Sequence, residues 1–107
     1  NCIRIPALIY ALDALKVYPQ EAQSYYLSGF IRTKLKKYDA ALEDFKRYEA
    51  ILPGNPNTIF FKGYAFEGMR NIEQAAGQYK QYLQIVNQGQ QAEHAYQRLV
   101  EWGYIQQ

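Results

Sequence analysis

The chain has 107 residues, of which 49% are hydrophobic and 21% are charged, and its net charge at pH 7 is +2. This composition excludes a disordered polypeptide and provides material for one domain with a modest core. The small net charge gives no sign of a nucleic-acid partner, and no apolar run is long enough to span a bilayer.

The N-terminal end comes first in chain order. Cys2 is the only cysteine, which excludes an internal disulfide framework and leaves the redox compartment open. Its place near the start would suit a lipid-carrying cysteine, but the chain begins with Asn and contains no signal segment. We therefore expect a fragment of a longer soluble protein, with the cytoplasm and the periplasm both open as its location.

The first three predicted helices cover Ile5–Tyr18, Ala22–Leu35 and Tyr38–Leu52. In the third, the apolar positions 38, 41, 42, 45, 48 and 51 advance by threes and fours, which is typical of an amphipathic helix. Pro53 and Gly54 follow directly, and this pair predicts the end of that helix.

Three more helices are predicted in the second half. Pro56–Met69 has Asn55 as its N-cap and a proline in its first turn. Ile72–Val86 repeats the apolar spacing of the third helix, and Asn71 opens a pattern that resembles a capping box. Gln91–Gly103 is the last helix. Because no segment alternates with a period of two, no sheet is expected.

The chain matches itself best at an offset of 34 positions, which we call the repeat length. Pairs at this offset include Gly29 and Gly63, Ala41 and Ala75, and Phe45 and Tyr79. A glycine inside a helix costs roughly 1 kcal/mol relative to alanine. Its recurrence predicts two helices that cross too closely for a side chain, with the alanines as the facing small surface and the aromatic rings in the adjacent gap.

This frame resembles the tetratricopeptide repeat, a helix–turn–helix unit of about 34 residues. The residues that match it are Tyr25, Gly29, Tyr38, Ala41, Phe45, Tyr48, Ile51 and Pro53 in one repeat, and Ile59, Gly63, Ile72, Ala75, Tyr79, Tyr82 and Ile85 in the next. The chain departs from the family pattern at Ser28 and Lys62, where leucine is usual, and at Arg32, where an aromatic residue is common.

The resemblance implies an all-α fold, a right-handed α-solenoid of antiparallel helix pairs that forms a single domain over residues 1–107. Residues 1–21 would hold the second helix of a truncated repeat. Residues 22–55 and 56–89 would be full repeats, and residues 90–107 a C-terminal capping helix. The helix at Ile5–Tyr18 would have no partner helix and would expose an apolar face. We therefore expect that the chain can self-associate through this half repeat.

In the family, the first helix of each pair lines a concave groove. The resemblance places the following residues there: Gln23, Tyr26, Phe30, Thr33, Asn57, Phe60, Tyr64, Glu67, His94 and Arg98, with Gln91 and Glu101 beside the last two. Four of these are aromatic, at the same two positions of both repeats. They predict either a groove for an extended or helical peptide or rings that pack against neighbouring repeats or one another.

One family variant clamps the C-terminal carboxylates of chaperone tails with Lys, Asn and Arg. This variant is not expected, because Tyr26, Phe30 and Phe61 stand at clamp positions and only Arg98 could take part. The basic turn at 32–37 would suit RNA, but the net charge of +2 argues against that partner and favours a solvated turn.

No catalytic or metal-binding set is predicted. His94 has no second His or Cys nearby in the sequence, and Ser24 and Ser28 have no accompanying base. We therefore expect a protein–protein interaction scaffold without catalysis or a cofactor. The alternative is a regulatory or substrate-delivering appendage of an enzyme domain upstream in a longer chain.

Overall fold

The computed structural model describes residues 20–106, which form five α-helices and no β-strand. The helices are α2 (Gln20–Lys34), α3 (Tyr38–Ile51), α4 (Pro56–Gly68), α5 (Ile72–Leu83) and α6 (Gln90–Glu101). The all-α prediction is confirmed for this part of the chain, and each helix starts or ends within a few residues of its predicted limits. The helix predicted at Ile5–Tyr18, most of the half repeat at 1–21, and Cys2 lie outside the described residues.

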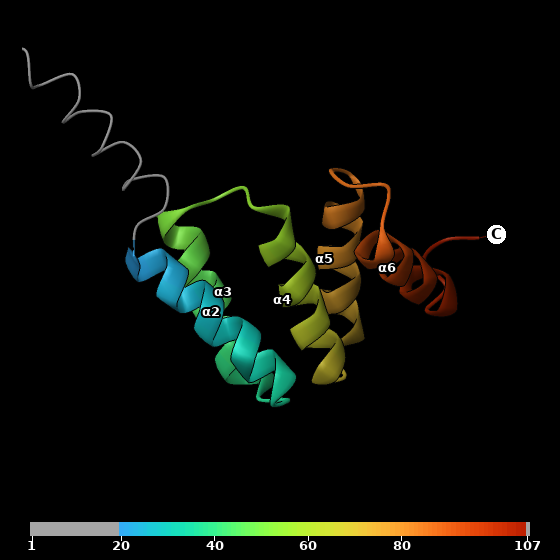
Figure 1. The fold of residues 1–107 in the computed structure, drawn as a ribbon. Coiled ribbons are helices and arrows are strands. Elements are labelled where there is room, and N and C mark those ends of the chain that lie inside the picture. The colour runs from blue at the N-terminus through green and yellow to red at the C-terminus, as the bar shows by residue number, and fades with distance from the viewer. Residues whose placement is uncertain (1–19, 107) are drawn as a thin grey trace, which may run out of the picture.

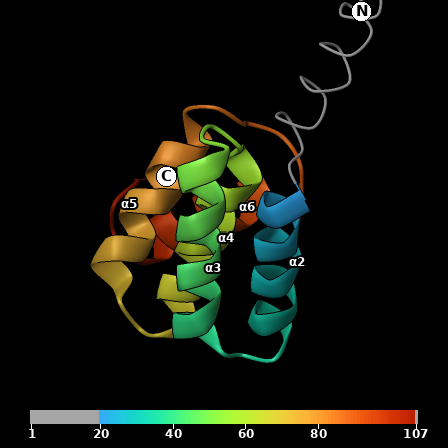
Figure 2. The same ribbon diagram turned by 90° about the vertical axis from the view of Figure 1, so that its left-hand side faces the viewer.

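The helices form two hairpins that lie side by side, with α6 at the end of the row (Figure 1). In the first hairpin α2 packs against α3, and in the second α4 packs against α5. Helix α4 also contacts α3, and α6 contacts α5 (Figures 1 and 2). The first helix pair therefore buries one side against the second pair, and the second pair buries one side against α6.

The turns inside the two hairpins have the same backbone geometry. Lys36 and Arg70 stand one repeat length apart, and both have a left-handed backbone, with φ of 62° and 65°. The next residue in each turn donates its N–H back into the first helix: Lys37 to the Arg32 carbonyl at 2.8 Å, and Asn71 to the Phe66 carbonyl at 2.9 Å. Because side chains disfavour this conformation by about 1–2 kcal/mol, its recurrence indicates a repeated structural unit.

Two predicted helix starts are observed. The side chain of Asn55 accepts a hydrogen bond from the backbone N–H of Asn57 at 2.9 Å, with Pro56 as the first helical residue of α4. The side chain of Asn71 accepts from the backbone N–H of Gln74 at 3.3 Å. This is the first of the two hydrogen bonds of a capping box. The backbone N–H of Asn71, which the second bond would use, donates to the Phe66 carbonyl in the turn. Both asparagines thus satisfy helix N–H groups that would otherwise lack a partner.

The prediction that glycine permits close helix crossing is confirmed in both hairpins. A Cβ on Gly29 would lie 2.8 Å from the ring of Phe45, and one on Gly63 would lie 2.7 Å from the ring of Tyr79. Both rings are fully buried. The group facing each glycine is therefore the ring itself, whereas alanines had been expected to supply the facing surface.

The departures from the repeat pattern in α2 form a polar cluster. Asp44 of α3 is 4% exposed, and its Oδ2 accepts a hydrogen bond from the Ser28 hydroxyl at 2.7 Å. The same oxygen lies 2.8 Å from the guanidinium of Arg32. In α4, Lys62 instead forms an ion pair with Glu49 of α3 at 2.7 Å. Helix α3 therefore supplies a carboxylate partner for each of these three polar residues, which explains why they can replace the usual apolar side chains.

Candidate functional site

A cavity lies at the first junction, the place where the α2–α3 hairpin meets α4. Its volume is about 310 Å³. The residues that line it are Phe30, Thr33, Lys34, Lys36, Tyr38, Phe60, Phe61 and Tyr64. Five of these eight are aromatic, so the cavity can cover an apolar group of a ligand.

The rings at the first junction hold one another in place. Phe30 meets Phe61 edge-on at 5.8 Å between ring centroids, and Tyr64 contacts both Phe60 at 6.2 Å and Tyr38 at 6.4 Å. Phe30 and Tyr64 are each 36% exposed, whereas Phe60 is only 6% exposed. Phe60 therefore forms the floor, and the other two rings present their surfaces to a ligand.

The charged side chains that line this cavity are both lysines. Lys34 places its ammonium 5.2 Å from the centroid of the Phe30 ring. Lys36 comes from the left-handed turn after α2. Thr33 is buried, and its hydroxyl donates to the Gly29 carbonyl at 2.8 Å, so it is already satisfied within its own helix. The charge offered to a ligand is accordingly positive.

Four predicted groove residues line this cavity: Phe30, Thr33, Phe60 and Tyr64. Sequence reasoning did not place Lys34, Lys36 and Tyr38 there, and it named Phe61 only as a residue at a carboxylate-clamp position. The two lysines belong to the basic turn that had been interpreted as solvated, and Tyr38 belongs to the apolar stripe of α3. Their shared position could have been found by following the turn, which brings the end of α2 and the start of α3 together.

The predicted residues nearer the start of α2 lie elsewhere. Tyr26 packs against Tyr48 at 5.2 Å and Phe45 at 5.9 Å between ring centroids. Burial, and then the neighbouring Tyr48, raise the pKa of Tyr26. Gln23 and Tyr26 line a separate, smaller cavity of about 120 Å³, and Asn57 is exposed. The structure therefore does not unite the predicted residues in one site.

The remaining predicted residues meet at the second junction, where the α4–α5 hairpin contacts α6. Glu67 lies 3.0 Å from Nε2 of His94 and 3.6 Å from the guanidinium of Arg98. It also accepts a hydrogen bond from the Tyr79 hydroxyl at 2.6 Å. Arg98 in turn pairs with Glu101 at 2.6 Å. These side chains bind one another, which leaves little hydrogen-bonding capacity for a ligand.

Burial raises the pKa of Tyr79 far above its usual range, and the hydrogen bond to Glu67 adds to the rise. The hydroxyl therefore stays protonated and remains the donor to the carboxylate under all ordinary conditions. Because Tyr79 belongs to α5 and both His94 and Arg98 belong to α6, one carboxylate on α4 joins three helices.

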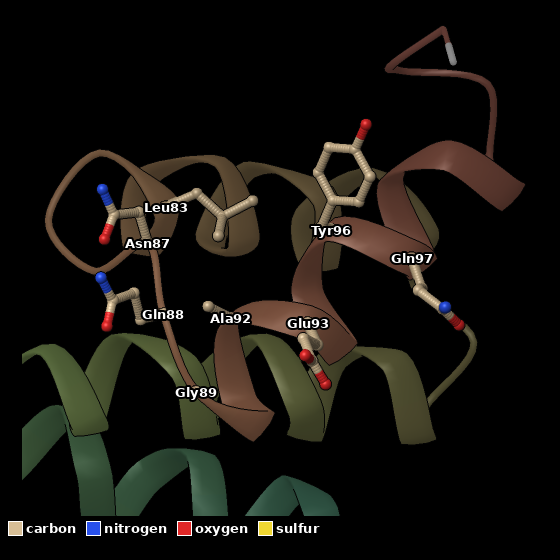
Figure 3. Close-up of a pocket in the computed structure, with 8 residues that line it drawn as sticks. All are labelled: Leu83, Asn87, Gln88, Gly89, Ala92, Glu93, Tyr96 and Gln97. Carbon is tan, nitrogen blue, oxygen red and sulfur yellow. The ribbon is translucent and has the colours of Figure 1, made fainter.

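A larger and more open cavity, of about 800 Å³, lies between the end of α5 and the start of α6 (Figure 3). The residues that line it are Leu83, Asn87, Gln88, Gly89, Ala92, Glu93, Tyr96 and Gln97. None of them had been predicted as a groove residue. Its walls combine amide and apolar side chains with the single carboxylate of Glu93, without an arrangement of acid, base and nucleophile.

Residues 20–106 contain neither a cluster of metal ligands nor a membrane-spanning helix. No three His, Cys, Asp or Glu side chains in this range lie close enough together to hold a metal ion. No helix in the same range combines the length and the hydrophobicity needed to cross a membrane.

Comparison of the chain with protein-family models, with curated proteins and with solved structures gives no match. A proposal about what the chain binds therefore rests on the geometry of the first junction.

Proposed function

We propose that this chain is a protein-interaction module of the tetratricopeptide type, without catalysis of its own, that binds a peptide segment of a partner protein at the first junction. The observation that carries the proposal is the aromatic cavity with its two lysines. The recurring turn and the recurring contact of glycine with an aromatic ring support a right-handed solenoid of repeats, since equal units stacked at equal spacing form one.

The cavity has the properties of a binding site for an apolar side chain. Phe30 and Tyr64 offer ring surface, and both rings are already ordered by their neighbours. A ligand therefore gains from covering apolar area without a large entropic cost for fixing these side chains. Well-packed aromatic residues of this kind commonly dominate the energy of peptide binding.

The lysines define the charge of the ligand. Lys34 and Lys36 stand at the same cavity as the rings, so the preferred segment would carry an acidic residue next to a large apolar one. Ion pairs at such a rim contribute modestly to affinity and are weakened by salt. The positions used for a carboxylate clamp in one variant of the family hold aromatic residues here, so this mode of binding differs from that clamp.

A random peptide library selected on the 107-residue chain tests the proposal. Enriched peptides should pair acidic with large apolar residues, and their dissociation constants can be measured by fluorescence anisotropy. We expect Phe30→Ala and Tyr64→Ala each to weaken binding by about tenfold, or about 1.4 kcal/mol. Replacing Lys34 and Lys36 by Gln should remove most of the salt dependence.

The matched control is Tyr104→Ala, because Tyr104 is 42% exposed and does not line this cavity. It should bind the enriched peptides as the unmodified chain does. Peptides that bind Phe30→Ala and Tyr64→Ala with undiminished affinity would show that the first junction is not the site.

A further inference from the structure

One side chain of α6, His94, contacts residues of both junctions. At the second junction its Nε2 lies 3.0 Å from a carboxylate oxygen of Glu67. Since a carboxylate oxygen accepts, Nε2 carries the hydrogen of this contact. The same imidazole ring lies against two aromatic rings of α4 that belong to the cavity at the first junction. His94 therefore offers a physical connection between the two junctions.

The two rings that His94 contacts are Phe60 and Tyr64. The centroid of the imidazole lies 5.8 Å from the centroid of the Phe60 ring and 5.7 Å from that of the Tyr64 ring. Phe60 is the floor of the cavity, and Tyr64 is one of the two rings that present their surfaces to a ligand. His94 itself does not line the cavity. It therefore supports the binding rings without facing a ligand.

The imidazole is itself held in place by two neighbouring helices. The ring of Tyr79 on α5 lies nearly perpendicular to it, at 5.7 Å between centroids. The Tyr79 hydroxyl donates to the same oxygen of Glu67 that His94 contacts. The imidazole is thus fixed by a carboxylate on α4 and by a buried ring on α5. A side chain fixed on two sides can restrict the motion of the rings that it touches.

Tyr64 depends on this support more than Phe60 does. The ring of Tyr64 is partly exposed, and its other ring contacts are with Phe60 at 6.2 Å and Tyr38 at 6.4 Å, both longer than its contact with His94. Phe60 is buried and packs against further buried rings. A partly exposed ring that loses a neighbour gains rotamer freedom, and a ligand that covers it must then remove this freedom.

We propose that His94 is a positioning residue for peptide binding at the first junction and couples this binding to the packing of α6 against α4 and α5. The inference rests on the proposed function of that junction. His94 orders Tyr64 before a peptide arrives, which lowers the entropic cost of binding. The second junction thereby affects the affinity of a cavity that no residue of α6 lines.

A coupling of this kind acts in both directions. If the packing of α6 favours peptide binding, a bound peptide favours the packing of α6 by the same factor. We therefore expect an enriched peptide to slow hydrogen exchange at the amide groups of α6 as well as at those of α4. His94→Ala should remove the slowing in α6 and keep it in α4. A peptide that slows exchange in α4 alone on the unmodified chain would contradict the coupling.

Two substitutions separate the ring contact of His94 from its hydrogen bond. His94→Phe keeps a ring against Tyr64 and loses the bond to Glu67, whereas His94→Gln keeps a donor and loses the ring. We expect His94→Gln and His94→Ala to raise the dissociation constant of an enriched peptide about fivefold, and His94→Phe to raise it by no more than about twofold. If His94 acted only by holding α6 through Glu67, His94→Gln would be the milder change.

Trp102 reports whether α6 stays packed in each variant. It is the only tryptophan of the chain, follows α6 directly, and stacks on Tyr79 at 5.9 Å between ring centroids. Its fluorescence should be the same in the variants and in the unmodified chain. A variant that loses this packing and still binds the peptide with full affinity would overturn the coupling. Tyr96→Ala is the matched control on α6 and should leave affinity unchanged, because Tyr96 is exposed and lines other cavities.

A measurement without peptide keeps this inference distinct from the proposed function. NMR relaxation of a labelled Tyr64 ring should show greater mobility in His94→Gln and His94→Ala than in the unmodified chain, and His94→Phe should restore the order. Equal mobility in all four chains would overturn the inference, whether or not a peptide binds. Peptide binding that requires Tyr64 but is unaffected by His94→Gln and His94→Ala would also overturn it and would leave the proposed function intact. Failure to find any peptide that depends on Phe30 and Tyr64 would instead count against the proposed function.

Discussion

The two junctions between successive helix units use the same positions of the repeat for opposite purposes. Thr33, Phe60 and Tyr64 surround an open, aromatic cavity at the first junction. At the second, the residues one repeat length later are Glu67, His94 and Arg98, which bind one another. The positions that hold two rings and a threonine around a cavity at the first junction thus hold three polar side chains in mutual contact at the second.

A repeat determines where side chains meet, but it does not determine what they do there. At the first junction the hydroxyl of Thr33 turns back to its own helix, which leaves the rings free to contact a ligand. At the second, the carboxylate of Glu67 reaches across to α5 and α6. If our proposal is correct, the same position of the repeat serves ligand binding at the first junction and cohesion between helices at the second.

The largest effect should come from a change that breaks the frame that both junctions share. Gly63→Leu would drive a side chain into the buried ring of Tyr79, which a Cβ alone would approach to 2.7 Å. We expect a loss of about 3 kcal/mol or more in the free energy of unfolding, measured by urea titration. An unchanged free energy of unfolding in urea would contradict the packing described here.

Gly77→Ala is the control for this change, because Gly77 also lies inside a helix but a Cβ added to it would meet nothing within 4 Å. It should raise the free energy of unfolding by up to about 1 kcal/mol through helix propensity. The opposite signs of the two glycine replacements would separate close packing from backbone preference.

A smaller effect should distinguish the two junctions directly. Glu67→Ala removes the acceptor of the Tyr79 hydroxyl and the partner of two α6 side chains, and should cost about 2 kcal/mol. Thr33→Ala, its equivalent, removes a bond within one helix and should cost about 1 kcal/mol or less. Equal losses for both variants in urea would show that the second junction is not held together by Glu67.

The smallest effect concerns alkaline pH. Since burial and the Glu67 carboxylate raise the pKa of Tyr79, the folded chain keeps a proton that the unfolded chain loses near pH 10. The stability that this tyrosine contributes is therefore fully present below about pH 10 and declines as the pH rises above it. The stability of Tyr79→Phe should fall off less steeply between about pH 10 and 11 in thermal melts, with Tyr104→Phe as the control.

Much of the scaffold could be predicted from the sequence, because its causes are local or periodic. Apolar residues at spacings of three and four specified the helices, and Asn55 before a proline specified the start of α4. Gly29 and Gly63 indicated close crossing, since glycine inside a helix lowers stability unless a close contact requires it. The predicted crossing was right even though the facing group is a ring and not alanine.

The candidate site could be predicted only in part, because its chemistry depends on contacts between distant segments. Glu67 and His94 are far apart in the chain, and no local pattern shows that they meet. Lys36 reaches the first junction from a turn with a left-handed backbone, which the sequence KKY does not indicate. The register of the repeat predicted which residues face the junctions. Which side chains pair with each other could be seen only in the folded structure.

The bridging position of Glu67 has a consequence for how the molecule opens. A helix at the end of a row usually frays on its own, because it has a neighbour on one side only. Here α6 is tied through a single carboxylate to both α4 and α5, so its departure would leave Glu67 without His94 and Arg98, its two partners on α6. We expect α4, α5 and α6 to exchange their amide hydrogens as one cooperative unit, while α2 and α3 form a second.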